Sequence, residues 1–391
     1  MIFDVSSLPA TLRLLILLSR LHLIESQKQD ALRLCLDIED WGPVAEEARR
    51  HFVLPLVYRH LNELRPQTMP HEVLERMHRD SVAIIQHNLC VAAVMQHLVR
   101  EVLEPLRIPH LFFKGPALAA SYYGDPAGRF CRDIDLLVSH GDMVALLEMA
   151  IRSGYRLLEP EGIAADRQSL AFAVDAHPVI TLVSPQGVPV ELHRRLDKMG
   201  AIYDTGSLLS NVENLPWGNA SLSVMPTDEL FVYVCLHHTR HRWSHLHWLV
   251  DLDAIQRSAG FNSAKVQHCA RQRGLTATVD AALELYRACS LIGNSEVSLP
   301  DTPGRELLCA CLTNLQGDRQ TELAQRRKNI SMDFAFSWQV TMVHRWACCW
   351  RKWCLMCRPS YMDYRRFPLP PRWRWLYWLM RPWRYLLKRL V

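Results

Sequence analysis

Residues 110–138 constrain the fold more than any other part of the chain, because they combine a charged turn with two closely spaced carboxylates. The pattern predicts an apolar strand at Leu111–Phe113, a turn at Lys114-Gly115 and a short helix at Pro116–Tyr122. A polar loop that contains Arg129 follows, and then a second strand at Asp133–Val138. Side chains alternate across a strand, so Asp133 and Asp135 share one face of the second strand and the apolar residues share the other. The sequence therefore predicts a buried apolar face with two carboxylates on the opposite side.

Such a carboxylate pair is suited to a bound cation. Two ionised carboxylates held close together raise one another's pKa unless a cation lies between them. Hard divalent ions with oxygen ligands fit, Mg²⁺ first and Mn²⁺ as the alternative, and they leave coordination positions for substrate phosphates. The turn at Lys114 and Gly115 precedes a helix N-terminus, which offers N–H groups to an anion. A solvated strand end explains the acids alone, but the ordered combination with Lys114 and Arg129 favours a metal and phosphate site.

This stretch resembles the nucleotidyltransferase superfamily with the polymerase-β-like fold, whose pattern is a Gly-Ser turn, a short helix and Asp-x-Asp/Glu on the next strand. It is more similar to a bacterial family of nucleotidyltransferases in which Leu-Lys-Gly and Arg…Asp-Ile-Asp-Leu-Leu-Val stand in those places. The resemblance is specific over residues 108–138 and looser elsewhere. Two departures matter: Pro116 replaces the usual Ser, which removes a hydroxyl and an N–H for phosphate, and the spacing from Gly115 to Asp133 is longer than in the smallest members.

The resemblance implies an α+β fold, with a small mixed sheet and helices as its core, and a third acid on a neighbouring strand. Glu191 is the candidate, because Val188–Arg194 reads as a strand on which Glu191 and His193 share a face. An exposed glutamate on an edge strand is the alternative. In the expected site, three acids bind the metal and are catalytic: Asp133, Asp135 and Glu191. The nucleotide is expected to be bound by Lys114, Gly115, Arg129 and His193.

The rest of the chain suggests four regions: a helical region at 1–106, the nucleotidyltransferase core at 107–200, a helical domain at 201–335 and a basic tail at 336–391. The first region contains a helix resuming at Val44, with Pro43 at its first position. A long helix follows Pro70 and ends near Glu104, because Pro105 and Pro109 cannot continue it. Further strands are expected at 155–158, 170–174 and 179–183, and a loop is expected around 216–218.

A histidine-rich stretch in the third region offers a rival metal site. His237 and His241 are four residues apart and would lie on one helical face, as metal-binding histidines sometimes do. With Asp251 they could form a zinc hydrolase centre, although no acid between them could serve as a base. The favoured interpretation is a helix pair that packs beside the sheet, with Asp251 paired to a basic group that the sequence does not identify.

The last region differs in composition. Trp338–Val391 holds eight of the chain's 12 tryptophans, with 12 Lys and Arg against one acid, Asp363. Charges interrupt every apolar run, so neither half can span a bilayer. Short helices with tryptophan and arginine are typical of interfacial membrane segments. Contact with a protein partner ranks second and single-stranded nucleic acid third, with packing of the tail on its own domain as the plain alternative. Four cysteines of this region, Cys348, Cys349, Cys354 and Cys357, lack a matching second pair for zinc.

Length and cysteine content bound the remaining possibilities. A chain of 391 residues can form two or three domains. Its 12 cysteines lie in no framework spacing and no secretory signal precedes them, which favours reduced thiols and a cytoplasmic protein, with peripheral membrane association through the tail.

The sequence thus predicts a metal-dependent nucleotidyltransferase that binds ATP or another NTP and transfers its nucleoside monophosphate to an acceptor hydroxyl. A small molecule, a peptide or a protein could be the acceptor. A non-catalytic nucleotide- or partner-binding protein and an Asp-x-Asp glycosyltransferase are the alternatives.

Overall fold

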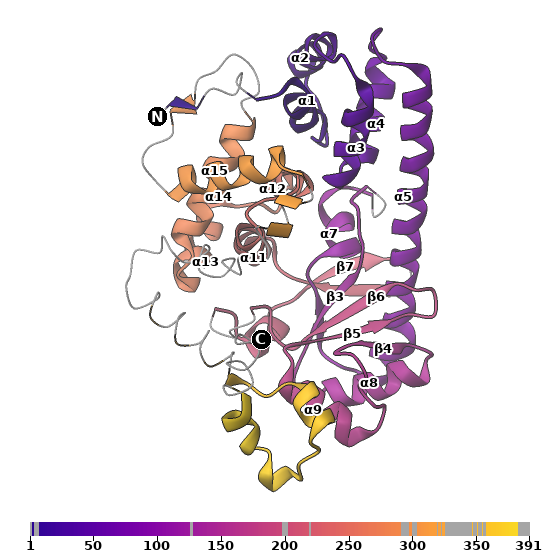
Figure 1. Ribbon diagram of the computed structural model, residues 1–391, viewed down its shortest axis with the longest axis vertical. Helices are drawn as coiled ribbons and strands as arrows, with labels where there is room; N and C mark the ends of the chain where they lie inside the picture. The colour runs from indigo at the N-terminus through magenta and orange to yellow at the C-terminus, as the bar shows by residue number, and fades with distance from the viewer. Residues whose placement is uncertain are drawn as a thin grey trace. The chain divides into compact units, whose positions relative to one another are not determined.

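The computed structural model describes residues 2–3, 8–125, 128–197, 202–218, 220–290, 297–298, 303–318, 320–321, 323–324, 346, 350, 354 and 357–381. The chain forms two compact units (Figure 1). The first contains Met1–Asn88, Ala119–Phe130 and Thr227–Val340, and the second contains Leu89–Leu118, Cys131–Pro226 and Thr341–Val391. The chain passes between them within helices α5 (His71–Leu98) and α7 (Gly115–Tyr122).

The first unit is helical in its described part, apart from the short antiparallel pair of β1 (Ile2–Phe3) and β9 (Val297–Ser298). Its helices besides α5 are α1 (Ala10–Leu18), α2 (Glu25–Leu36), α3 (Trp41–Arg50), α4 (Leu54–Leu64), α11 (Thr227–Arg240), α12 (His247–Arg257), α13 (Ser263–Arg273), α14 (Thr276–Ser290) and α15 (Pro303–Gln316).

The second unit is built on a seven-stranded mixed sheet. Its strands are, in spatial order, β4 (Arg156–Glu159), β5 (Val179–Val183), β6 (Pro189–His193), β3 (Ile134–Val138), β2 (His110–Phe112), β8 (Ala220–Val224) and β7 (Glu213–Trp217). The β3–β6 and β2–β8 pairs are parallel and the others antiparallel. Its remaining helices are η2 (Val99–Leu103), α6 (Glu104–Leu106), α8 (Met143–Arg152), α9 (Arg167–Ala176), α10 (Thr205–Ser210), α19 (Tyr361–Arg366) and η3 (Pro371–Trp373).

One face of this sheet carries the core of the second unit. Alternate residues of β3, β5 and β6 are fully buried there, namely Ile134, Leu136, Val138, Ile180, Leu182, Val190 and Leu192. Residues of α8, α9 and the end of α5 complete the cluster, and Figure 1 shows α8 and α9 beside β4 and β5. Because side chains alternate, the odd-numbered residues of β3 and β6, with Asp135, Glu191 and His193, lie on the opposite face.

The long helix expected after Pro70 is observed as α5, which continues through the π-helical turn η2 into α6. The helical run therefore passes Pro105, which was expected to end it, and stops at Leu106. Among the described residues it is the one helix long and apolar enough to cross a membrane, judged by length and composition alone. Core helices meet the same criterion, and the second part of α5 has a core role: Val91, Val94, Met95 and Leu98 are buried in the cluster under the sheet.

The strand expected at 170–174 is wrong, because these residues lie in the middle of α9. A short apolar run of this length fits a buried helix as well as a strand. The signal that decides lies upstream: the Asp166 side chain accepts a hydrogen bond from the Ser169 N–H and caps the helix.

The loop expected around 216–218, within a region expected to be helical, is also wrong. The strands β7 and β8 form an antiparallel hairpin there, closed at Gly218, whose φ is 56°. Pro216 argued against a strand, because proline has no N–H to donate to the hydrogen bonds between strands. It is tolerated since β7 lies at the edge of the sheet.

The start expected for the helix near Val44 was three residues late. Helix α3 begins at Trp41, and the Asp40 side chain accepts a hydrogen bond from the Gly42 N–H as its cap. Pro43 therefore lies at the third helical position rather than at the first. The expected α+β class, with a mixed sheet as core and helical regions around it in the sequence, is confirmed. The division into four regions stays a prediction.

Candidate metal and nucleotide site

The turn that opens the site follows β2. Gly115 has a φ of +59°, a conformation that residues with a Cβ rarely adopt. A Cβ at this position would lie 3.0 Å from the backbone oxygen of Asp133. The Lys114-Gly115 turn is therefore held directly against the entry of β3, and glycine is required there for two reasons.

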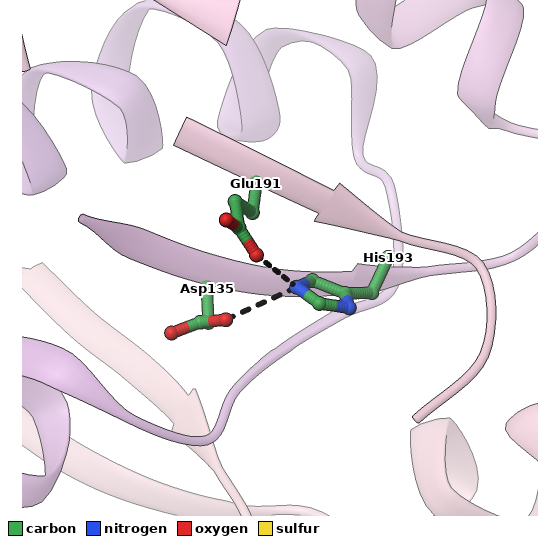
Figure 2. Close-up of side chains that lie close together, drawn as sticks. All are labelled: Asp135, Glu191 and His193. Carbon is green, nitrogen blue, oxygen red and sulfur yellow. Dashed lines mark hydrogen bonds and ion pairs between the residues drawn. The ribbon is translucent and has the colours of Figure 1, made fainter. Parts of the chain in front are cut away.

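The acids come from two neighbouring parallel strands. In the register of β3 and β6, Asp135 is paired with Glu191, and Leu137 is paired with His193. Parallel pairing with this register places three polar side chains on one face (Figure 2). The third acid expected from the sequence thus lies beside Asp135.

Three ligand atoms converge at this point. The Nε2 atom of His193 lies 3.0 Å from Oδ1 of Asp135 and 3.3 Å from Oε2 of Glu191 (Figure 2). Carboxylates only accept hydrogen bonds, so Nε2 of His193 carries the proton in this arrangement. The ligand atoms of the three residues all lie within 4.8 Å of one another, and this is the one such group among the described residues. With Nε2 deprotonated, the same atoms could hold a metal ion.

Lys114 completes the charge balance of the site. Its Nζ lies 3.1 Å from Oδ1 of Asp135, the same oxygen that His193 contacts. Asp135 is 3% exposed, and burial alone would raise its pKa. The charge of Lys114 and the hydrogen bond from His193 outweigh burial and hold the pKa of Asp135 well below its ordinary range. Asp135 is therefore ionised at neutral pH.

Asp133 lies just before β3 and is the more exposed of the pair. Its carboxylate contacts the guanidinium of Arg132 at 3.2 Å, and its side chain is 22% exposed. Burial, together with the negative charges of Asp135 and Glu191, raises the pKa of Asp133. Because Asp135 and Glu191 repel a negative charge on Asp133, a cation near the three acids would reduce this repulsion.

The predicted residue Arg129 is described with the first unit. It makes a bidentate pair with Asp251, with Nε 2.7 Å from Oδ1 and Nη2 2.8 Å from Oδ2. Tyr123 donates to the same carboxylate at 2.6 Å, and Nε2 of His238 lies 3.4 Å from it. The role of Arg129 in nucleotide binding stays a prediction.

The partner of Asp251 is thus Arg129, which sequence analysis could not identify. The two residues are 122 positions apart, and no periodic pattern connects a loop arginine with a helical aspartate. Burial raises the pKa of Asp251, but the charge of Arg129 outweighs it and lowers the pKa strongly. Because Asp251 is occupied in this way, the described residues give no support to a zinc centre of His237, His241 and Asp251.

The fold and the site define an α+β protein whose sheet carries a carboxylate and histidine group able to hold a metal beside a lysine. Residues 37–290 match the model of a protein family described as uncharacterised nucleotidyltransferase, and the chain belongs to this family. Membership implies a nucleoside triphosphate as substrate.

Two further comparisons add little. No curated protein matches the chain. Among solved structures, the crystal structure of an antigenic nucleotidyltransferase-like protein from Paracoccidioides brasiliensis is similar, with 16% identity, 65% of this chain and 93% of that chain covered, and a TM-score of 0.25. Similarity at this level says nothing about the activity of the present chain.

Proposed function

We propose that this protein is a metal-dependent nucleotidyltransferase of the polymerase-β-like superfamily, which transfers a nucleoside monophosphate from an NTP to an acceptor hydroxyl. The observation that supports this most is the pairing of Asp135 with Glu191 on adjacent parallel strands, with Lys114 at hydrogen-bonding distance. In the reaction, the hydroxyl oxygen bonds to the α-phosphorus, the bond from that phosphorus to the bridging oxygen breaks, and pyrophosphate leaves. The hydroxyl proton passes to solvent or to a neighbouring carboxylate.

Each residue has a part in this proposal. Asp133, Asp135 and Glu191 would hold the divalent cation, which when bound would neutralise the triphosphate and lower the pKa of the attacking hydroxyl. Lys114 binds a phosphate as a point charge, and the backbone N–H groups at the start of α7, to which Pro116 contributes none, bind another phosphate oxygen. His193 orients the Asp135 carboxylate, which it contacts at 3.0 Å. Phosphoryl transfer asks mainly for this positioning and charge neutralisation.

The donor set bears on the choice of ion. Carboxylate oxygens suit Mg²⁺ and Mn²⁺, whereas imidazole suits softer ions. If His193 acts only through Asp135, the carboxylates alone fit Mg²⁺. If Nε2 of His193 is itself a ligand, the group of Asp135, Glu191 and His193 fits Mn²⁺ better. Comparing the affinities of both ions for the wild type and for His193→Gln distinguishes these arrangements.

The central test replaces two acids at once. We expect the double variant Asp133→Asn, Asp135→Asn to lose Mg²⁺- or Mn²⁺-dependent NTP turnover, because two ligand charges are removed. Asp135→Asn also leaves Lys114 and His193 without their buried charged partner, so the circular dichroism spectrum must match that of the wild type for the loss to be assigned to the site. Pyrophosphate release with each of the four common NTPs is the measurement.

A matched control neutralises two exposed acids of the same unit, Glu159→Gln and Glu161→Gln, and should retain turnover. Undiminished turnover in the aspartate double variant would contradict the proposal.

A second candidate is a nucleotide-binding protein without transferase chemistry. It is favoured by Pro116, which lies at the second position of α7 and offers no N–H to a phosphate. Calorimetric titration with Mg²⁺ and NTP separates the two candidates, because binding without pyrophosphate release would support the second. An Asp-x-Asp glycosyltransferase has less support: before β2 the described residues contain only helices and the two-residue strand β1, rather than the nucleotide-binding α/β unit of such enzymes.

A further inference from the structure

The C-terminal segment at 357–381 is folded against the second unit along one side. Tyr361 and Tyr377 are buried in the core cluster beneath the sheet. Tyr364 stacks on Phe172 of α9 with a ring distance of 4.5 Å, and Figure 1 shows this segment, in yellow, beside α9. The Tyr377 hydroxyl donates to the backbone oxygen of Phe367. These contacts give the segment a fixed inner side.

The other side of the segment leaves large apolar side chains in solvent. Trp378 and Leu379 are 47% and 66% exposed on a helical stretch at 376–381, and Trp375, directly before it, is 55% exposed. Their spacing of three and four positions puts them on one side of the chain. Three more large apolar side chains of the segment are exposed: Met362, Phe367 and Trp373. Exposed apolar side chains gathered in one short segment mark a candidate interaction site.

The charge around these side chains has one sign. The segment at 357–381 contains six arginines and a single acid, Asp363. Asp363 is buried, where it accepts hydrogen bonds from the Ser360 hydroxyl and from Arg381. Arg366 and Arg372 are exposed. The segment therefore combines exposed tryptophans with two exposed arginines, Arg366 and Arg372.

We propose that the outer side of residues 357–381 binds the surface of an anionic lipid bilayer. Tryptophan rings favour the level of the lipid headgroups, and arginines beside them attract anionic lipids. Exposed aliphatic side chains such as Leu379 and Met362 can enter the acyl boundary, whereas they offer no flat surface on which a nucleic acid base could stack. In this proposal the segment lies on the surface of the bilayer and does not span the bilayer, because its arginines interrupt every apolar run.

The test measures binding of the full-length chain to vesicles. We expect cosedimentation with vesicles of phosphatidylcholine and phosphatidylserine, and at least tenfold weaker binding to phosphatidylcholine alone. Arg366→Gln with Arg372→Gln should weaken binding to the anionic vesicles roughly 30-fold, since each basic residue near such a surface contributes about fivefold. Trp375→Ala with Trp378→Ala should weaken it at least as much and should reduce the blue shift of tryptophan fluorescence, to which Trp373 can still contribute.

Controls separate this surface from general effects. Leu158→Ala removes a side chain of the same unit that is 47% exposed and lies outside the segment, and it should bind as the wild type does. Circular dichroism checks the fold of every variant. Equal binding to both vesicle types, no binding to either, or unchanged binding by both double variants would overturn the proposal. So would binding to a single-stranded oligonucleotide in place of the anionic vesicles.

Discussion

Lys114 makes the strongest single contribution to the charge balance of the site. It donates to the buried oxygen of Asp135, which a divalent cation would also use. The ammonium and the cation therefore compete for one carboxylate. A bound triphosphate offers Lys114 another anionic partner, so nucleotide and cation should strengthen each other's binding.

We expect Lys114→Met to bind Mn²⁺ roughly 10- to 100-fold more tightly than the wild type when nucleotide is absent, because a charge-assisted hydrogen bond that competes with the ion is worth about 1.5–3 kcal/mol. The same variant should bind NTP more weakly and lose the coupling between the two ligands. Isothermal titration measures both affinities. Lys114→Arg, which keeps the charge, is the control; a decrease in Mn²⁺ affinity in Lys114→Met would contradict the competition.

His193 gives the metal-free protein a pH-dependent stability. Burial lowers the pKa of His193, but hydrogen bonds to Asp135 and Glu191 outweigh burial and raise it above its ordinary value of 6.5. The stabilisation is complete below pH 6.5 and is lost as the pH rises through the higher pKa of the folded state. We therefore expect the free energy of unfolding, measured with urea in the presence of a chelator, to decrease over that range. His193→Gln should remove this decrease, and replacement of the exposed His268 by Gln should leave it unchanged.

At the level of elements, the turn into α7 depends on Gly115. We expect Gly115→Ala to destabilise the second unit by more than about 1–2 kcal/mol, the usual penalty of a left-handed residue with a Cβ, because the new Cβ also approaches the Asp133 carbonyl. Gly187 provides a matched control, since it also has positive φ but nothing lies within 4 Å of a Cβ there. Urea unfolding measures both variants, and an equal loss in the two would show that the close approach has no energetic effect.

The elements that could be predicted from sequence are those whose pattern is local. Alternation along β3 and β6 was enough to put Asp135, Glu191 and His193 on faces that could meet. Helix α9 and the β7–β8 hairpin were missed because the deciding features were an upstream cap and an edge position in the sheet. Neither feature changes the hydrophobic pattern of the segment itself. The contact from Lys114 to Asp135 could not be derived either, because it depends on how closely the turn approaches β3.

At the scale of a whole unit, the buried ion pair of Arg129 and Asp251 joins two distant segments of the first unit. Removing one partner of a buried ion pair leaves an uncompensated charge and typically costs about 3–5 kcal/mol. We expect Asp251→Asn to destabilise the protein by an amount of this order, because Arg129 and Asp251 are both almost fully buried. Thermal and urea unfolding provide the measurement.

The double variant Arg129→Met, Asp251→Leu tests the cause of that loss. It removes both charges and keeps apolar volume, so it should be less destabilised than Asp251→Asn. A larger loss in the double variant would indicate that packing, rather than the unpaired charge, explains the effect.

The parallel register of β3 and β6 has a consequence for how the chain folds. The strands that carry Asp135 and Glu191 are separated by α8, β4, α9 and β5, so they meet only after that whole stretch has closed. An ion bound between them would find no binding site in an early, partly folded chain. The bound ion would therefore mainly lower the rate of unfolding and would leave the rate of folding nearly unchanged.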